Sequence, residues 1–85
     1  MMNHKLLDTV ATLKPISINL LTLVEPEYQS IQNLSIGQVG TIVQIYEADQ
    51  FQYLVEFADV QGREYAMAIL RADEILALHY ELTLA

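Results

Sequence analysis

Apolar and polar residues alternate with a period of two along the centre of this chain, the pattern of a β-strand with one buried face. In the clearest stretch, every second position is apolar or aromatic, at Phe51, Tyr53, Val55 and Phe57. A second stretch follows the same rule at Tyr65, Met67 and Ile69. Between them lie turn residues, Asp59-Val60-Gln61-Gly62, and Gly62 can take the positive φ that closes a hairpin with a bulge. The pattern predicts a hairpin with Tyr53 and Tyr65 in the core.

Three further strands are predicted on either side of this hairpin. Residues 38–46 are rich in β-branched side chains, which favour strands. Gly37 suits a turn before this strand, and Gly40 inside it indicates a bulge or a sharp coil of the sheet. A first strand from Leu6 to Leu13 ends before Pro15, and a last strand from Leu76 to Leu84 follows one tight helical turn at residues 71–74. The three central strands are joined by short turns and form a meander.

Residues 16–34 fit more than one structure. The part from Ile16 to Val24 reads as an extra strand or as an apolar loop. Pro26 suits the first position of a helix, and Tyr28, Ile31 and Leu34 recur at three-residue spacing, so a short helix after Glu25 is also predicted.

These elements predict a single, mostly β domain over residues 1–85. Five antiparallel strands with one short helical turn before the last match a small SH3-like barrel, a shape that leaves few strand edges exposed. An inserted segment and a C-terminal strand extension complete the predicted fold.

The composition adds a reason to expect a partner. The chain has 85 residues, of which 53% are hydrophobic and 18% are charged, so apolar surface is in surplus for so small a domain. The formal charge of -7 opposes binding to nucleic-acid phosphates or to anionic membranes. The absence of cysteine removes disulfides and thiolate chemistry. With no secretion signal or membrane-spanning run, the expected location is the cytoplasm.

Residue types that carry catalysis are sparse. Ser17, Ser30 and Ser35 read as loop residues without an adjacent base. His79 is expected on the solvated side of the last strand, and His4 in a frayed terminus. The acidic pairs 47/49 and 73/74 lie where turns carry acids, and Asp73 or Glu74 is expected to cap the helical turn. We therefore expect no enzyme activity, no metal, no cofactor and no small-molecule substrate.

Several blocks of the sequence resemble a family of short bacterial proteins that is common in cyanobacteria, the domain-of-unknown-function family numbered 4926. The matching blocks run in order from Leu6 to Leu78: Leu6-Leu7-Asp8-Thr9-Val10-Ala11, Lys14-Pro15-Ile16, Gly37-Gln38-Val39-Gly40-Thr41-Ile42-Val43, Val55-Glu56-Phe57, Gly62-Arg63-Glu64-Tyr65-Ala66 and Ala72-Asp73-Glu74-Ile75-Leu76. The resemblance implies an SH3-like fold without a known activity. It also implies a partner encoded nearby, with this chain as the small neutralising half of a two-gene pair.

The chain departs from the family pattern by an insertion at about residues 17–32 and an extension at about residues 79–85. Both are apolar, and they define the predicted interaction surface, which consists of Ile18, Leu20, Leu21, Leu23, Val24, Tyr80, Leu82 and Leu84. The predicted function is an acidic protein-interaction module that binds another protein chain, either a second copy or a neighbouring gene's product. Two alternatives stay open: an SH3-like barrel that binds nucleic acid, and a stable monomer without a partner.

Overall fold

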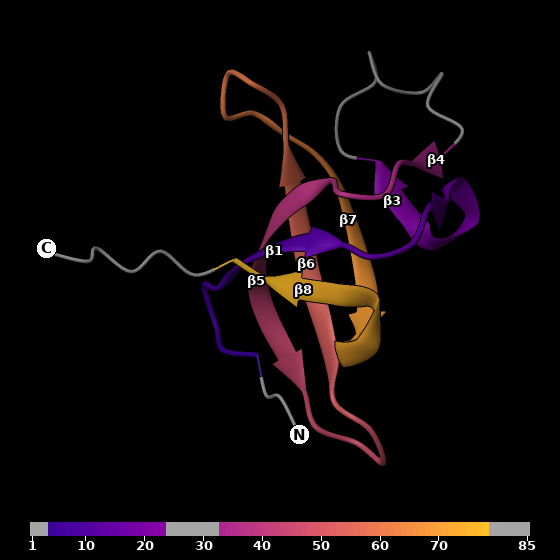
Figure 1. Cartoon of the computed structure of the whole chain (residues 1–85), viewed down its shortest axis with the longest axis vertical. Coiled ribbons are helices and arrows are strands. Elements are labelled where there is room, and N and C mark those ends of the chain that lie inside the picture. The colour runs from indigo at the N-terminus through magenta and orange to yellow at the C-terminus, as the bar shows by residue number, and fades with distance from the viewer. Residues whose placement is uncertain (1–3, 24–32, 79–85) are drawn as a thin grey trace, which may run out of the picture.

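The computed structural model describes residues 4–23 and 33–78, apart from the side chain of Ile18. The strands in this part of the chain are β1 (Thr9–Thr12), β2 (Ile16–Ser17), β3 (Leu21–Leu23), β4 (Asn33–Leu34), β5 (Val39–Tyr46), β6 (Gln52–Ala58), β7 (Glu64–Arg71) and β8 (Ile75–Ala77). Two 3-10 turns, η1 (Ile18–Leu20) and η3 (Ala72–Glu74), interrupt them (Figure 1). The mostly β prediction is confirmed, as is the helical turn before the last strand.

The strands form a six-stranded sheet in the order β3-β7-β6-β5-β1-β8 and a separate two-stranded pair of β2 with β4. Every pairing is antiparallel. The predicted meander is confirmed as β5-β6-β7, and β1 pairs with both β5 and β8. The sheet gains one strand beyond the predicted five, because β3 from the insertion pairs with β7.

The core lies against the inner face of this sheet and is built mainly by β6 and its neighbours. Tyr53, Val55 and Phe57 of β6 are almost fully buried, as the alternation predicts. They pack with Val10 of β1 and Ile42 of β5 in one cluster of buried residues. Phe51 is an exception to the predicted pattern: it precedes β6 and is exposed, since the strand begins only at Gln52.

The predicted inner face of β7 is wrong. Ala66, Ala68 and Leu70 are buried, whereas Met67 is half-buried and Ile69 is exposed. The cause is an irregularity in the β6–β7 pairing, where Phe57 is opposite Ala66 but Ala58 is opposite Glu64. The extra residue is Tyr65, which stays buried, and from there on the alternation is reversed.

Two of the three glycines adopt the conformation that the turns require. Gly37 and Gly62 have φ values of 84° and 82°, which confirms the predicted turns. Gly40 acts differently, because a Cβ atom there would lie 2.6 Å from Val55 Cγ1 and 2.8 Å from the Glu56 carbonyl oxygen. The irregularity in the pairing of β5 with β6 lies further along, between Ile42 and Gln44. Gly40 therefore permits close packing of β5 on β6.

The N-terminal part differs from the prediction in two ways. The first strand begins at Thr9 and not at Leu6, because Leu7 has a φ of 70° and the Asp8 N–H donates to the Lys5 carbonyl oxygen in a turn. His4 is buried and not frayed: its Nε2 lies 3.2 Å from the Ala72 carbonyl oxygen, and its ring meets Tyr53 edge-on at 5.2 Å. A carbonyl oxygen only accepts, so His4 Nε2 carries the proton of this bond.

The ambiguous region is partly decided by the structure. Residues 16–23 form β2, η1 and β3 in succession. The prediction of an extra strand is therefore correct for both ends of this segment, and a 3-10 turn separates them. Most of the short helix predicted after Glu25 lies outside the described residues, but the prediction is wrong for Leu34, which lies in β4 opposite Ile16. The last strand beyond Leu78 also lies outside the described residues. No helix within residues 4–23 and 33–78 is long and apolar enough to cross a membrane.

Candidate functional site

The outer surface of β1, β5 and β8 exposes a group of large apolar side chains, which we call the outer apolar face. Its members are Leu13, Val39, Leu76 and Leu78, with exposed fractions of 45%, 48%, 47% and 41%. Ile36 adjoins it in the turn before β5 and is also exposed. Solvated faces of antiparallel sheets usually carry polar residues, so this concentration is unusual.

The strand register places these side chains together. Ala11 in β1 is opposite Val39 in β5 on one side and Leu76 in β8 on the other, which makes one row across three strands. Val10 and Thr12 of β1 are buried, so Ala11 points outward with the rest of the row. Figure 1 shows β1 lying between β5 and β8 on the near side of the domain.

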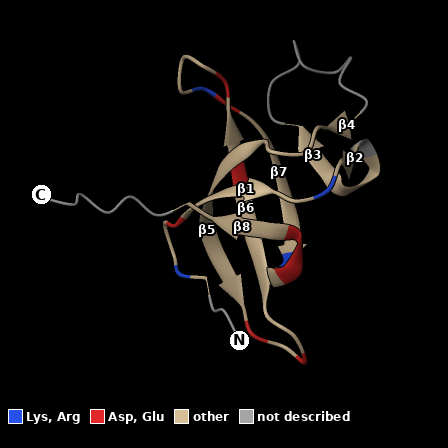
Figure 2. Ribbon diagram, in the orientation of Figure 1, with Lys and Arg blue, Asp and Glu red and all other residues tan. Residues whose placement is uncertain are grey.

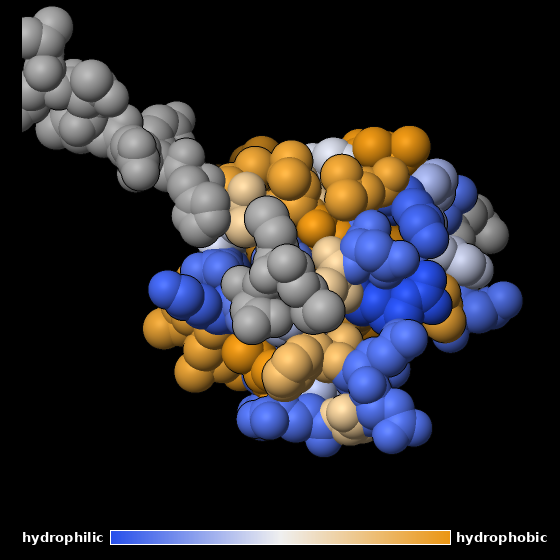
Figure 3. Space-filling view, turned by 60° about the horizontal axis from the view of Figure 1, so that its bottom comes forward, coloured by the Kyte–Doolittle hydropathy of each residue, from blue (hydrophilic) through white to orange (hydrophobic). Residues whose placement is uncertain are grey.

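No charged residue interrupts this face within the strands. The sequences of β1, β5 and β8 contain neither Lys, Arg, Asp nor Glu, and Figure 2 shows all three strands without charge colouring. In Figure 3, hydrophobic side chains gather along the upper edge of the molecule and again at its lower left, and hydrophilic side chains lie between and beside these two areas. The exposed apolar residues therefore have no charged neighbour within these three strands.

Buried Thr12 fixes the loop beside this face. Its hydroxyl donates to the Ser35 carbonyl oxygen at 2.9 Å and accepts from the Gln38 N–H at 3.0 Å. The Thr12 backbone adds a bond from its N–H to the Gln38 carbonyl oxygen at 2.9 Å, and its carbonyl oxygen accepts from the Gly37 N–H at 2.7 Å. These four bonds hold the start of β5, with Val39, against the end of β1.

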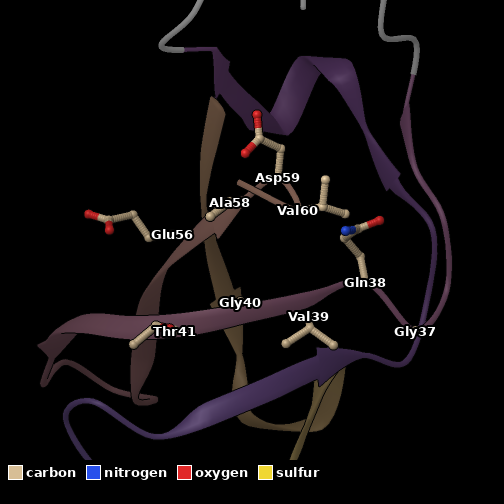
Figure 4. Close-up of a pocket in the computed structure, with 9 residues that line it drawn as sticks. All are labelled: Gly37, Gln38, Val39, Gly40, Thr41, Glu56, Ala58, Asp59 and Val60. Atoms are coloured by element: carbon tan, nitrogen blue, oxygen red, sulfur yellow. The ribbon is translucent and has the colours of Figure 1, made fainter. Parts of the chain in front are cut away.

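A shallow hollow of about 350 Å³ continues from this face between β5 and the β6–β7 turn. It is lined by Gly37, Gln38, Val39, Gly40, Thr41, Glu56, Ala58, Asp59 and Val60 (Figure 4). Val60 stands fully exposed at the turn, which Asp59 holds by accepting from the backbone N–H groups of Gln61 and Arg63. The hollow is open, and the polar side chains of Gln38, Thr41, Glu56 and Asp59 line it together with the apolar side chains of Val39, Ala58 and Val60.

Glu56 and Glu64 form an acidic pair on β6 and β7, which lie on the opposite side of β5 from β1 and β8 in the sheet order. Glu56 in β6 is opposite Thr41 of β5, and Glu64 begins β7. A hydrogen bond with Glu56, loss of hydration, and the negative charge of Glu56 together raise the pKa of Glu64 to about 7. Near neutral pH the Glu64 carboxyl group is thus protonated for part of the time.

Both described arginines are paired with acids. Arg63 Nε lies 3.2 Å from Asp59 Oδ2, and Arg71 Nε lies 3.3 Å from Asp73 Oδ1. The Arg71 backbone N–H donates to Glu74 Oε1 at 2.8 Å, which confirms the expected capping of the helical turn. These partners reduce the positive potential that either arginine offers to a phosphate.

The structure places the predicted interaction residues unevenly. Leu20 is exposed, but Leu21 and Leu23 are half-buried and pack against the domain's own core. β3, which contains them, pairs with β7, and no pairing with β8 occurs among the described residues. Val24, Tyr80, Leu82 and Leu84 lie outside the described residues, as does the side chain of Ile18.

The outer apolar face was not predicted as a whole. Leu76 and Leu78 were assigned to the last strand, in the same alternating row as Tyr80, Leu82 and Leu84. That row is the available signal, and it begins at Leu76, four residues before Tyr80, the first C-terminal residue of the predicted surface. Leu13 and Val39 could join it only after the pairing of β1 with β5 and β8 was known.

Within the described ranges, no group of three or more His, Cys, Asp or Glu residues is arranged to hold a metal ion. A family model described as "Domain of unknown function (DUF4926)" matches residues 6–77 of the chain. The search of curated proteins and the search of solved structures found no match to this chain. The family resemblance seen in the sequence is confirmed.

Proposed function

This chain belongs to the DUF4926 family, and we propose that it is a protein-interaction module that binds another protein chain in the cytoplasm through its outer apolar face. The partner is either a second copy of this chain or the product of a neighbouring gene. In the second case, this small acidic protein would neutralise the activity of that product. We further propose that the sheet closes as an SH3-like barrel. The five predicted strands and the 3-10 turn before the last of them support that architecture.

The observation that carries the proposal is the uncharged row of exposed side chains across β5, β1 and β8. Contiguous apolar surface on a small domain marks a binding site more often than isolated exposed leucines do. Val39 begins β5 and Leu76 lies in β8, while Leu13 and Leu78 directly follow β1 and β8. The pairing of β1 with β5 and β8 brings these exposed residues onto one side of the sheet.

The binding energy would come from removing this surface from water. Complete burial of a large aliphatic side chain contributes roughly 1.5–3 kcal/mol, and each of these residues is a little under half exposed. Each would therefore contribute about 1 kcal/mol when covered. The surrounding acidic groups would set the orientation of the partner and its rate of association more than its affinity.

The test is affinity capture from the native cell, with the neighbouring gene's product present. The variant Val39→Gln/Leu76→Gln removes the centre of the outer apolar face, and we expect it to lose the partner that the unmodified chain retains. The matched control is Ile69→Gln, because Ile69 is exposed to 51% but lies on β7. We expect this control to keep the partner.

Sedimentation of the purified chain separates the two kinds of partner. A homodimer that Val39→Gln/Leu76→Gln converts to a monomer identifies the second copy, whereas a monomeric protein that needs the face for capture identifies a different chain. Equal capture by the face variant and by the Ile69 control would refute the proposed function, provided that both variants fold.

A further inference from the structure

The turn that precedes β1 exposes two neighbouring leucines. Leu6 and Leu7 are exposed to 55% and 70%. The turn runs from Lys5 to Asp8, and the Asp8 N–H closes it by donating to the Lys5 carbonyl oxygen at 3.1 Å. Two large apolar side chains are therefore held in water at the start of the domain.

Leu7 adopts a backbone conformation that leucine normally avoids. Its φ of 70° lies in the left-handed region, where the Cβ atom crowds the following carbonyl oxygen. A positive φ at the third residue of a four-residue turn is characteristic of type II turns, in which glycine is favoured at that place. The chain follows this preference at Gly37 and Gly62, the other described residues with a positive φ. Among the described residues, position 7 is thus the place where a bulky side chain is kept against backbone strain.

Packing within the domain does not account for this leucine. Leu6 and Leu7 belong neither to the cluster of buried residues nor to the half-buried residues that pack against it. Strained residues are concentrated at binding and catalytic sites, where the strain is compensated by the structure around them. The exposed leucine therefore indicates a contact outside the domain.

Hydrogen bonds on both sides fix the turn in place. Before it, the chain is anchored by buried His4, and the Lys5 N–H donates to Asp8 Oδ2 at 2.9 Å. After it, the Leu7 N–H donates to the Ile42 carbonyl oxygen at 2.8 Å, and the Ile42 N–H donates to the Asp8 carbonyl oxygen at 3.0 Å. A preformed turn loses little conformational entropy on binding, so more of its contact energy becomes affinity.

Charge narrows the choice of partner. The turn contains one lysine, Lys5, and one aspartate, Asp8, so its own net charge is zero and its contact is mainly apolar. The whole chain has a formal charge of -7, which disfavours an anionic membrane and a second copy of the same chain. The same charge favours association with a basic protein.

We propose that Leu6 and Leu7 are a preformed anchor that inserts into an apolar pocket of a basic partner protein. The anchor lies at the end of β1 that also holds Leu78 of the outer apolar face, because the Leu78 N–H donates to the Thr9 carbonyl oxygen. In Figure 1 the segment before β1 meets the end of β8 at the left of the domain. This inference rests on the proposed function, to which it adds a protruding contact and the charge of the partner.

The first experiment compares the thermal stability of the unmodified chain with that of Leu7→Ala and Leu7→Gly. Leu7→Ala removes the exposed side chain and keeps the strain, so we expect an unchanged Tm. Leu7→Gly also relieves the strain, so its Tm should exceed that of Leu7→Ala by roughly 4–8 °C. A marked fall of Tm in Leu7→Ala, or a lower Tm for Leu7→Gly than for Leu7→Ala, would show that the leucine serves the domain's own stability and would overturn the inference.

The second experiment places a photoreactive benzophenone side chain at position 7 of the full chain. The matched control carries it at Ile69, which is exposed to 51% on β7. In extract of the native cell, we expect only position 7 to form a covalent adduct with one basic protein, at residues that line an apolar pocket of that protein. Equal adducts from the two positions would contradict the proposal.

Competition measures the contribution of the leucine. Burial of one leucine side chain is worth about tenfold or more in affinity, so Leu7→Gly should need about tenfold more protein than the unmodified chain to suppress the adduct. Equal suppression by the two competitors would refute the anchor.

Two measurements on the purified chain identify other occupants of the turn. We expect no cosedimentation with vesicles of phosphatidylcholine, with or without phosphatidylserine. Vesicle binding that Leu7→Gly abolishes would assign the turn to a membrane, and a dimer that Leu7→Gly converts to a monomer would assign it to a second copy. Either result would overturn the inference.

Capture from the native cell separates this inference from the proposed function. Loss of the partner by Leu7→Gly, with a Tm no lower than that of the unmodified chain, supports the anchor. If Leu7→Gly retains the partner that Val39→Gln/Leu76→Gln loses, the proposed function stands and the anchor inference falls. Retention of the partner by both variants would refute both.

Discussion

Replacement of Gly40 by alanine tests whether the close packing of β5 on β6 is as tight as described. The added Cβ would lie 2.6 Å from Val55 Cγ1, 2.8 Å from the Glu56 carbonyl oxygen and 2.9 Å from Phe57 Cδ1. Val55 and Phe57 are fully buried and the oxygen belongs to the backbone, so none of the three atoms can move away cheaply. Overpacking of a core costs typically 1–3 kcal/mol, and we expect the upper part of that range.

A partial offset comes from the unfolded state, because alanine restricts the unfolded chain and contributes about 0.4–1 kcal/mol to stability. The net expectation for Gly40→Ala is a loss of about 2 kcal/mol, measured as the free energy of unfolding by denaturant. In a domain of this size, that loss corresponds to a fall in Tm of roughly 8–16 °C.

The double variant Gly40→Ala/Val55→Ala sharpens this test. It removes the methyl group that makes the shortest contact, so its loss of stability should be smaller than the sum of the two single losses. Gly62→Ala is the contrasting control, since nothing lies within 4 Å of its added Cβ and only its φ of 82° opposes the change. A Gly40→Ala protein as stable as the unmodified chain would show that the contact between β5 and β6 is looser than the structure indicates.

Three further substitutions probe other contacts. Thr12→Val leaves the Gln38 N–H and the Ser35 carbonyl oxygen without their hydroxyl partner, and it should cost about 1–3 kcal/mol in urea unfolding; an unchanged midpoint would contradict the role of these bonds. His4→Ala removes the hydrogen bond to the Ala72 carbonyl oxygen and the ring contact with Tyr53, so we expect the free energy of unfolding, measured in urea, to fall by about 1–2 kcal/mol. An unchanged free energy of unfolding would mean that these contacts do not anchor the N-terminal segment. Glu64→Gln tests the raised pKa of Glu64. A carboxyl group whose pKa is raised by folding lowers the stability of the protein as the pH rises from about 4.5 to about 7. After allowance for solvent screening, the variant should therefore be up to about 1 kcal/mol more stable than the unmodified chain at about pH 8 and should differ little from it at about pH 4. Parallel stability curves for the two proteins would refute the coupling with Glu56.

The sequence determines the strands well but not the face that each one presents. Period-two alternation predicts β6 and β7, and the β-branched residues of 38–46 predict β5. It failed on β7, where the irregularity at Tyr65 reverses the alternation and small alanines, not Met67 and Ile69, point into the core. An irregularity of that kind depends on the partner strand, so it leaves no mark on the alternation of β7 alone.

The candidate site shows the same limit. Leu76 and Leu78 could be assigned to a strand, but whether they are buried or exposed depends on which strand lies beside them. His4 was expected to be frayed because it lies near the terminus, and only the packing around Tyr53 and Ala72 shows that it is fixed. Contacts between residues far apart in the chain decided both cases.

The position of β1 links the outer apolar face to the order in which the chain folds. β5, β6 and β7 are consecutive in the chain, and the loops between them are short, so we expect their pairing to form early. Val10, by contrast, pairs with Gly40 and with Ala77, so β1 brings together the two ends of the described chain. Because these pairings join segments far apart in the chain, we expect the surface proposed for binding to be completed late in folding, and we expect a partner that covers it to slow unfolding.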